Sequence, residues 1–249
     1  MFKSSEFVEY VNSMVGMPYW YGTCGYKCSE SLLTSKAKQY PSHYSNARMP
    51  KYRDAIKKKL VCTDCVGLIK SFFWTNGGQG VLDYINGTGD FTNKYKSNDC
   101  PDKSANGMLS WCKQQGAKFG KIATLPDVPG VLVFSPAHVG VYVGDGRVTE
   151  ARGFNYGVVQ TEVDKRPWVD WAYLPSFLLQ YDGEPEIVVP ENMITITGSS
   201  VNIRKGPGTS YGTLKVAKKG EKFEKVDTSG WAPIVINGAI YWVSEKYSD

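Results

Sequence analysis

The sequence predicts two domains of different class, an α+β domain with helices packed on an antiparallel sheet and, after it, a small all-β barrel. Three observations support this prediction. Apolar residues recur with helical spacing near the N-terminus and again after residue 64. From residue 138 they alternate with polar residues, as in a half-buried strand. Beyond residue 183 the pattern changes to short alternating segments separated by glycine-rich turns.

Composition and charge limit the class of protein. The 249 residues are 42% hydrophobic, which can support real cores, and the chain contains no apolar run long enough for a membrane span. The N-terminus lacks the apolar segment of a secretion signal, so the six cysteines are interpreted as thiols rather than as a disulfide framework. Residues 23–60 hold nine basic and two acidic residues. This local charge favours an anionic partner such as nucleic acid, a membrane surface or a cell-wall polymer.

The first predicted element is a helix near the N-terminus. Its apolar side chains would form one buried stripe of Phe7, Val8, Val11, Met14 and Val15. We expect this helix to pack against the predicted sheet.

The second predicted helix follows the segment LVCTDC at residues 60–65. Thr63 or Asp64 can cap it. Its buried stripe would consist of Cys65, Ile69, Phe72 and Phe73. Cys65 would then lie in the first turn, where the unpaired amides and the helix dipole favour a thiolate and lower the thiol pKa. Because the thiolate is the reactive form of cysteine, Cys65 is a candidate nucleophile.

A cysteine nucleophile also needs a base, and the chain has only two histidines. His43 lies in YPSHYSNARMP, a polar loop without periodicity. His138 begins the segment HVGVYVG, in which valines alternate with His138, Gly140 and Tyr142 as in a half-buried strand. His138 is therefore the candidate base.

The turn after this strand decides whether a third group can orient His138. A two-residue turn at 145–146 would pair residue i with residue 291−i and would place Glu150 on the opposite face. A three-residue loop, starting one residue earlier with Gly146 left-handed in a bulge, makes the pairs sum to 290 and places Glu150 opposite Gly140. We predict the three-residue loop, with Glu150 diagonal to His138, fixing its tautomer and stabilising its imidazolium.

A domain boundary is predicted at residues 183–193, since the stretch DGEPEIVVPEN is acidic and contains two prolines. The domains would be 1–182 and 194–249. In the second, the dipeptide Asn237-Gly238 between two apolar segments is typical of a two-residue hairpin, and five short strands would close a small barrel.

The C-terminal segment also resembles the bacterial SH3-like cell-wall domains over essentially its whole length. The resemblance lies in the strand NIR, the turn GPG, the step KKGEKF and the closing YWVSEKY. It implies that residues 194–249 hold the protein on the cell wall.

The N-terminal segments TDCVGLIKSFFW and PGVLVFSPAHVGVYVGDG resemble the NlpC/p60-type cysteine peptidases, which are papain-like enzymes that cut peptidoglycan stem peptides. The match covers roughly residues 5–180. The resemblance implies that Cys65 is the nucleophile, that His138 is the base and that Glu150 is the third polar residue. It implies neither a cofactor nor a metal.

The same resemblance suggests a substrate pocket. The family has a tyrosine in a Gly-x-Pro-Tyr stretch, which corresponds to GMPYWYG here, so Tyr19 is expected in the pocket near the cysteine. Asp64, beside the cysteine, is expected to contact substrate as well. Compact family members lack the long segment 23–60, so these residues are an insertion, and insertions tune substrate choice.

Other interpretations of the cysteines are open at this point. The spacing of Cys24, Cys28, Cys62 and Cys65 is compatible with a four-thiolate zinc site. Cys62 and Cys65 could also form a redox pair, but the proline and tryptophan of a thioredoxin-like motif are missing. The zinc site would consume the one cysteine placed to meet His138, so we predict catalysis without a bound metal.

The sequence thus predicts a two-domain, monomeric peptidoglycan hydrolase that, by resemblance, cleaves the bond from γ-D-glutamate to a diamino acid. Its partners would be stem peptides and a cell-wall polymer, without nucleic acid and without a membrane span. The alternatives are an amidase of the related CHAP class, which cuts the bond joining glycan to peptide, and a non-catalytic wall-binding or phage-structural protein. With no visible signal, the protein would be a phage lysin or a secreted enzyme in its mature form.

Overall fold

The computed structural model describes residues 2–182, 193–224, 231–236 and 239–247. The chain divides into two compact units, Met1–Glu186 and Ile187–Asp249, each of which has its own buried core. The linker predicted at 183–193 lies almost entirely outside the described residues.

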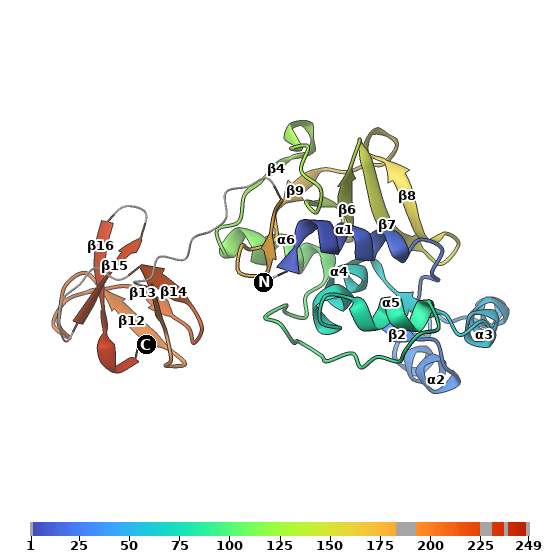
Figure 1. The fold of residues 1–249 in the computed structure, drawn as a ribbon, viewed down its shortest axis with the longest axis horizontal. Coiled ribbons are helices and arrows are strands. Elements are labelled where there is room, and N and C mark those ends of the chain that lie inside the picture. The colour runs from blue at the N-terminus through green and yellow to red at the C-terminus, as the bar shows by residue number, and fades with distance from the viewer. Residues whose placement is uncertain (1, 183–192, 225–230, 237–238, 248–249) are drawn as a thin grey trace. The chain divides into compact units, whose positions relative to one another are not determined.

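An antiparallel sheet of six strands forms the centre of the first unit, in the order β4-β9-β5-β6-β7-β8. Strands β6, β7 and β8 stand side by side in Figure 1. The strands are β4 (Phe119–Lys121), β5 (Leu132–Ser135), β6 (His138–Gly144), β7 (Arg147–Gly153), β8 (Gly157–Glu162) and β9 (Asp170–Ala172). A separate parallel pair joins the two ends of this unit, β1 (Phe2–Lys3) and β10 (Leu179–Gln180).

The helix α4 (Cys65–Trp74) is the most buried helix of the first unit. Every residue from Val66 to Trp74 is buried, and the helix contacts α1 (Ser4–Ser13), β6 and β7. Its buried side chains therefore extend well beyond the predicted stripe, and they include the polar residues Lys70 and Ser71. Other helices of this unit are α5 (Gln79–Ile85), α6 (Ala105–Gln114) and the 3₁₀ turns η1 (Asn46–Arg48), η2 (Ile122–Thr124) and η3 (Val163–Lys165).

The N-terminal helix is present as predicted, but two members of its expected buried stripe are not buried, since Val8 is only half-buried and Val15 is exposed. Phe7, Val11 and Met14 are fully buried, and the Phe7 ring packs 5.0 Å from that of Phe72 in α4. Val15 is 43% exposed, so its expected place in the buried stripe is wrong. The helix ends at Ser13, and beyond that point the helical spacing no longer applies.

The insertion folds as a lobe with a core of its own. It contains the strand β2 (Cys24–Lys27), which pairs with β3 (Val61–Thr63) just after the insertion, and the helices α2 (Glu30–Gln39) and α3 (Met49–Lys57). The buried residues of this core are Trp20, Cys28, Leu33, Tyr44, Tyr52, Ala55 and Cys62. The basic residues of the insertion are therefore part of a folded segment that has its own core.

The second unit is all-β. Its described strands are β11 (Met193–Thr195), β12 (Val201–Arg204), β13 (Thr213–Ala217), β14 (Lys222–Glu224), β15 (Trp231–Ile236) and β16 (Ala239–Ser244), followed by η4 (Glu245–Tyr247). The described part holds six strands, one more than predicted. Ile236 pairs with Ala239 on either side of the predicted turn at 237–238, which lies outside the described residues. The predicted fold class, α+β followed by a small all-β domain, is confirmed.

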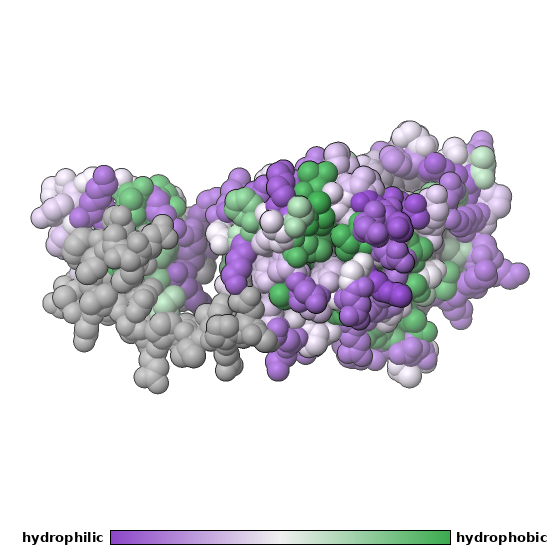
Figure 2. All heavy atoms as spheres, turned by 90° about the horizontal axis from the view of Figure 1, so that it is seen from above, coloured by the Kyte–Doolittle hydropathy of each residue, from purple (hydrophilic) through white to green (hydrophobic). Residues whose placement is uncertain are grey.

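One face of the first unit is mainly polar (Figure 2). On the face shown in Figure 2, hydrophilic residues cover most of this unit, and smaller hydrophobic areas lie between them. Within the described ranges, no helix has the length and apolar character needed to cross a membrane.

Candidate active site

Cys65 is the first residue of α4, and Asp64 caps this helix as predicted. One Asp64 oxygen accepts from the backbone amide of Gly67 at 2.7 Å, and the other accepts from that of Gly22 at 2.9 Å. Both oxygens are therefore committed to positioning the helix start and the neighbouring loop. A direct contact between Asp64 and substrate stays a prediction.

His138 begins β6, and its ring is held from two sides. Its Nε2 lies 2.6 Å from a carboxylate oxygen of Glu150, and the indole of Trp168 stacks on the imidazole with 5.5 Å between ring centroids. The backbone amide of Val139, the next residue, favours the ionised form of the Cys65 thiol and so acts to lower its pKa. Since Glu150 occupies Nε2, Nδ1 is the ring nitrogen that this carboxylate does not engage.

The β6–β7 hairpin places Glu150 on the same sheet face as His138, but the turn and the bulge of this hairpin differ from the prediction. The register sums to 290 at the pairs Val141–Thr149 and Tyr142–Val148, as expected, and Gly146 has a positive φ of 67°. The three-residue loop is wrong, because the turn consists of two residues and the register shifts within β6, between residues 142 and 144. The bulge thus lies in the strand, and it corrects the register that a two-residue turn alone would give.

Gly140 supplies the space between the two side chains. A Cβ at Gly140 would lie 3.3 Å from the Cβ of Glu150 and 3.0 Å from the ring of Trp168. The predicted position of Glu150, opposite Gly140 and diagonal to His138, is therefore confirmed.

Glu150 is fully buried and saturated with donors. Besides His138, it accepts from Thr161 Oγ1 at 2.8 Å and from Arg166 at 2.7 Å through Nε and 3.0 Å through Nη2. Burial by itself raises the pKa of Glu150, but the hydrogen bonds from His138, Arg166 and Thr161 outweigh it and lower the pKa to about 2. The carboxylate is therefore ionised at neutral pH.

Arg166 was missed in the sequence analysis. It lies between η3 and β9, outside any periodic pattern. The prediction that Glu150 lies on a buried sheet face could have pointed to it, because a buried carboxylate needs a cationic partner.

This buried carboxylate should make stability depend on acid pH. The folded pKa lies below the ordinary value of 4.5, so the stabilisation is complete above pH 4.5 and is lost as the pH falls towards 2. At roughly 1.4 kcal/mol per pKa unit, the loss would be about 3 kcal/mol. In urea unfolding experiments, the free energy of unfolding of the parent should fall by this amount between pH 5 and pH 2, and that of Glu150→Gln should lack this fall. Equal pH slopes for the two proteins would contradict it.

The Cys65 thiol differs from the sequence-based expectation. Burial raises its pKa to about 12, and the Asp64 carboxylate also raises it, whereas the amides of Val66, Val139 and Cys65 lower it. The expectation that the helix start alone favours a thiolate is wrong, because burial outweighs the amides. The thiol would therefore need a base to ionise at neutral pH.

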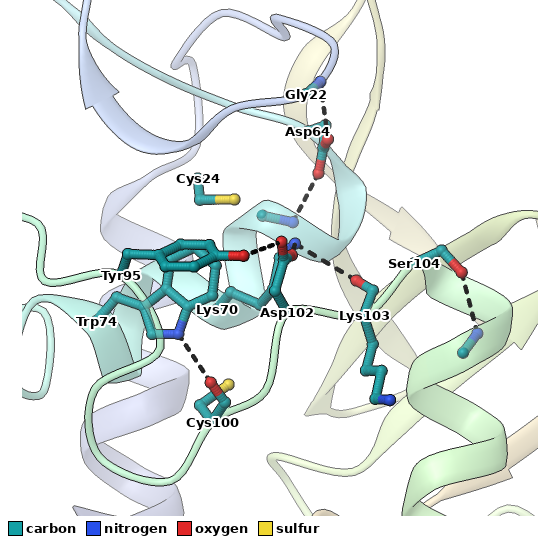
Figure 3. Close-up of polar contacts among 12 residues, drawn as sticks. Gly22, Cys24, Asp64, Lys70, Trp74, Tyr95, Cys100, Asp102, Lys103 and Ser104 are labelled. Atoms are coloured by element: carbon teal, nitrogen blue, oxygen red, sulfur yellow. Dashed lines mark hydrogen bonds and ion pairs between the residues drawn. The ribbon is translucent and has the colours of Figure 1, made fainter.

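A cavity of about 500 Å³ opens beside Cys65, and Tyr19 and Asp64 line it as well. The structure thus brings the predicted pocket residues to the cysteine. Figure 3 shows part of the cavity wall, where Lys70 of α4 pairs with Asp102 at 2.6 Å and Tyr95 donates to the other Asp102 oxygen at 2.9 Å. The lining residues include Tyr21, Lys36, Gln39 and Tyr40 from the insertion and the turn before it.

The zinc alternative finds no support in the described part of the chain. There, no three histidine, cysteine, aspartate or glutamate side chains gather in a way that could hold a metal ion. Cys62 is fully buried in the core of the insertion, where its thiol donates to the carbonyl of Tyr26 at 3.3 Å.

Comparison with known proteins bears on both units. Residues 199–249 match the bacterial SH3 domain family, which confirms the predicted nature of the second unit. A search of curated proteins found no match.

Solved structures resemble the chain at low identity. The NlpC/p60 domain of the peptidoglycan hydrolase SagA is 12% identical, with a TM-score of 0.35, covering 69% of this chain and 99% of that chain. The P60 domain of antigen MAP1204 from M. avium subspecies paratuberculosis is 17% identical, with a TM-score of 0.35, covering 69% and 97%. Ly7917 with the hydrolysing product of MDP is 15% identical, with a TM-score of 0.30, covering 99% and 97%. We therefore base the functional assignment on the geometry of the site.

Proposed function

We propose that this chain is a peptidoglycan hydrolase whose first unit is a cysteine endopeptidase acting on stem peptides. The observations that support the proposal are that Cys65 begins α4, which packs on β6, and that His138 begins β6 with its Nε2 bound by the buried Glu150. A nucleophile, a base and a group that orients the base are the parts that covalent acyl transfer requires.

The chemistry follows from these positions. As the Cys65 sulfur attacks the peptide carbonyl, Nδ1 of His138 takes the thiol proton and Glu150 stabilises the imidazolium. The backbone amide of Cys65 at the helix start stabilises the oxyanion. The imidazolium then protonates the leaving amine, the C–N bond breaks and a thioester remains. Water, deprotonated by His138, hydrolyses the thioester and frees the thiol.

The bond and the location are further parts of the proposal. By the resemblance of its sequence motifs, the bond is the one from γ-D-glutamate to a diamino acid, and no cofactor takes part. The SH3 unit would bind the wall polymer, and the protein would reach the wall either as a phage lysin or as a secreted enzyme.

Digestion of purified sacculi, with the products identified by mass spectrometry, tests the proposal. Cleavage within the stem should release muropeptides shortened at the diamino acid. Release of whole stems from the glycan would instead favour the CHAP-type amidase. No release by the parent protein would favour a non-catalytic wall-binding or phage-structural role.

Removing residues 187–249 should affect the two kinds of substrate differently. Cleavage of a soluble stem peptide should stay within about twofold of the parent, whereas digestion of intact walls should fall about tenfold or more, because tethering raises the local substrate concentration. Cys65→Ser in the full chain serves as the control for wall binding and should sediment with sacculi. An equal loss on both substrates would mean that the second unit helps to build the active site.

A further inference from the structure

The second histidine of the chain, which the proposed catalysis does not use, belongs to an aromatic cluster in which Tyr21 is exposed and the other two rings are half-buried. The rings of Tyr21 and His43 are stacked, with 3.7 Å between centroids and 4° between planes. Tyr40 meets Tyr21 edge-on, at 5.0 Å and 85°. We call Tyr21, Tyr40 and His43 the aromatic platform.

Exposure separates the platform from the core of the insertion. Trp20, Tyr44 and Tyr52 lie next to it in the sequence or in the fold, and they are at most 4% exposed. Tyr21 is 37% exposed although His43 covers part of it. Core packing therefore explains the first three rings and leaves the exposure of Tyr21 unexplained.

The backbone of the platform is fixed and is tied to the catalytic helix. The hydroxyl of Tyr44 donates to the carbonyl of Tyr21 at 2.7 Å, and the amide of Gly22 donates to Asp64, the residue before Cys65. Gly22 has a φ of +75°, and a Cβ there would lie only 2.4 Å from the ring of Tyr40. The close packing of Tyr40 on this loop therefore requires glycine. A binding surface held this way loses little entropy when a ligand arrives.

The platform opens into the same cavity as the nucleophile. Tyr21 and Tyr40 line the cavity of about 500 Å³ together with Cys65. Two polar side chains of α2, Lys36 and Gln39, line it next to them, and Lys36 donates to Gln39 at 3.1 Å. Aromatic faces beside a few placed polar groups are the usual lining of a site for an uncharged, partly apolar ring.

We propose that the platform binds a sugar ring of the glycan that carries the stem peptide, an inference that rests on the proposed function. A pyranose presents C–H bonds on its faces and hydroxyl or acetamido groups at its rim. The C–H face would lie on Tyr21, and the rim groups would meet Gln39 and Lys36. The insertion then has a defined task, which is to make the enzyme prefer peptide still attached to glycan over free peptide.

A pair of substrates tests this inference, the free stem peptide and the same peptide on its disaccharide. The parent should cleave the disaccharide-linked peptide with about tenfold higher kcat/KM, the size expected for one aromatic stack with its polar contacts. Tyr21→Ala should bring this ratio close to one, and Tyr21→Phe, which keeps the ring, should preserve it. Tyr156→Ala is the matched control, because Tyr156 is 56% exposed and lies outside the cavity lining.

Binding gives a second readout that needs no turnover. In the Cys65→Ser background, calorimetry with the disaccharide-linked peptide should show about tenfold weaker binding after Tyr21→Ala, and no change after Tyr156→Ala. Equal kcat/KM for the two substrates in the parent, or an unchanged ratio in a folded Tyr21→Ala, would overturn the platform while leaving the hydrolase intact. Failure of the parent to cleave either substrate would instead overturn the proposed function.

Discussion

Cys65→Ser should abolish cleavage of the stem peptide, with a fall in kcat/KM of about 10⁴-fold or more, because the change removes the nucleophile on which the other groups act. The fold should persist, since the hydroxyl is smaller than the thiol and α4 keeps its Asp64 cap. Peptide turnover and thermal unfolding of the two proteins provide the measurements.

Cys62→Ser is the matched control, since Cys62 lies three residues before Cys65 and is fully buried in a different core. A serine there can still donate to the carbonyl of Tyr26, so most of the activity should remain. An inactive, folded Cys62→Ser together with an active Cys65→Ser would reverse the assignment of the nucleophile.

Glu150→Ala should lower both stability and activity. It leaves the guanidinium of Arg166, which is 19% exposed, without its bidentate partner, and breaking such a pair costs about 3–5 kcal/mol. Activity should fall by about 10²-fold or more because His138 loses the group that fixes its tautomer. Urea unfolding and kcat/KM on the soluble peptide measure the two effects.

Glu150→Gln should retain more activity than Glu150→Ala. Its amide oxygen can still face Nε2 of His138, and the hydroxyl of Thr161 can turn to accept from the amide nitrogen. Neither variant should reach the loss expected for Cys65 or His138. Glu162→Ala, which removes an exposed carboxylate on β8, should behave like the parent. If Glu150→Ala folds and keeps full activity, a residue other than Glu150 must orient His138.

Local chemistry explains what could be predicted. The Asp64 cap and the helix at Cys65 follow from a short-range pattern, and the face of Glu150 follows from the period of two along a strand. The bulge was placed wrongly because an extra residue in the loop and one in the strand give the same register further along. Pairing arithmetic cannot tell these two cases apart.

Long-range packing explains what could not be predicted. Arg166 lies sixteen residues after Glu150 in the chain, and it meets the carboxylate only because β7, β8 and the segment after η3 fold together. The high pKa of Cys65 has the same origin, since the burial that raises it comes from elements distant in the sequence. The platform around Tyr21 likewise exists only once the insertion has packed.

Trapping the acyl-enzyme tests the central claim most directly. Acid quenching during turnover of a stem-peptide ester, followed by peptide mapping with mass spectrometry, should find the acyl group on Cys65, and the adduct should be absent from Cys65→Ser. Its formation should be much slower in His138→Ala, because the thiol, with a pKa near 12, then lacks its base. An adduct on another residue, or rapid turnover without any adduct on Cys65, would contradict the account.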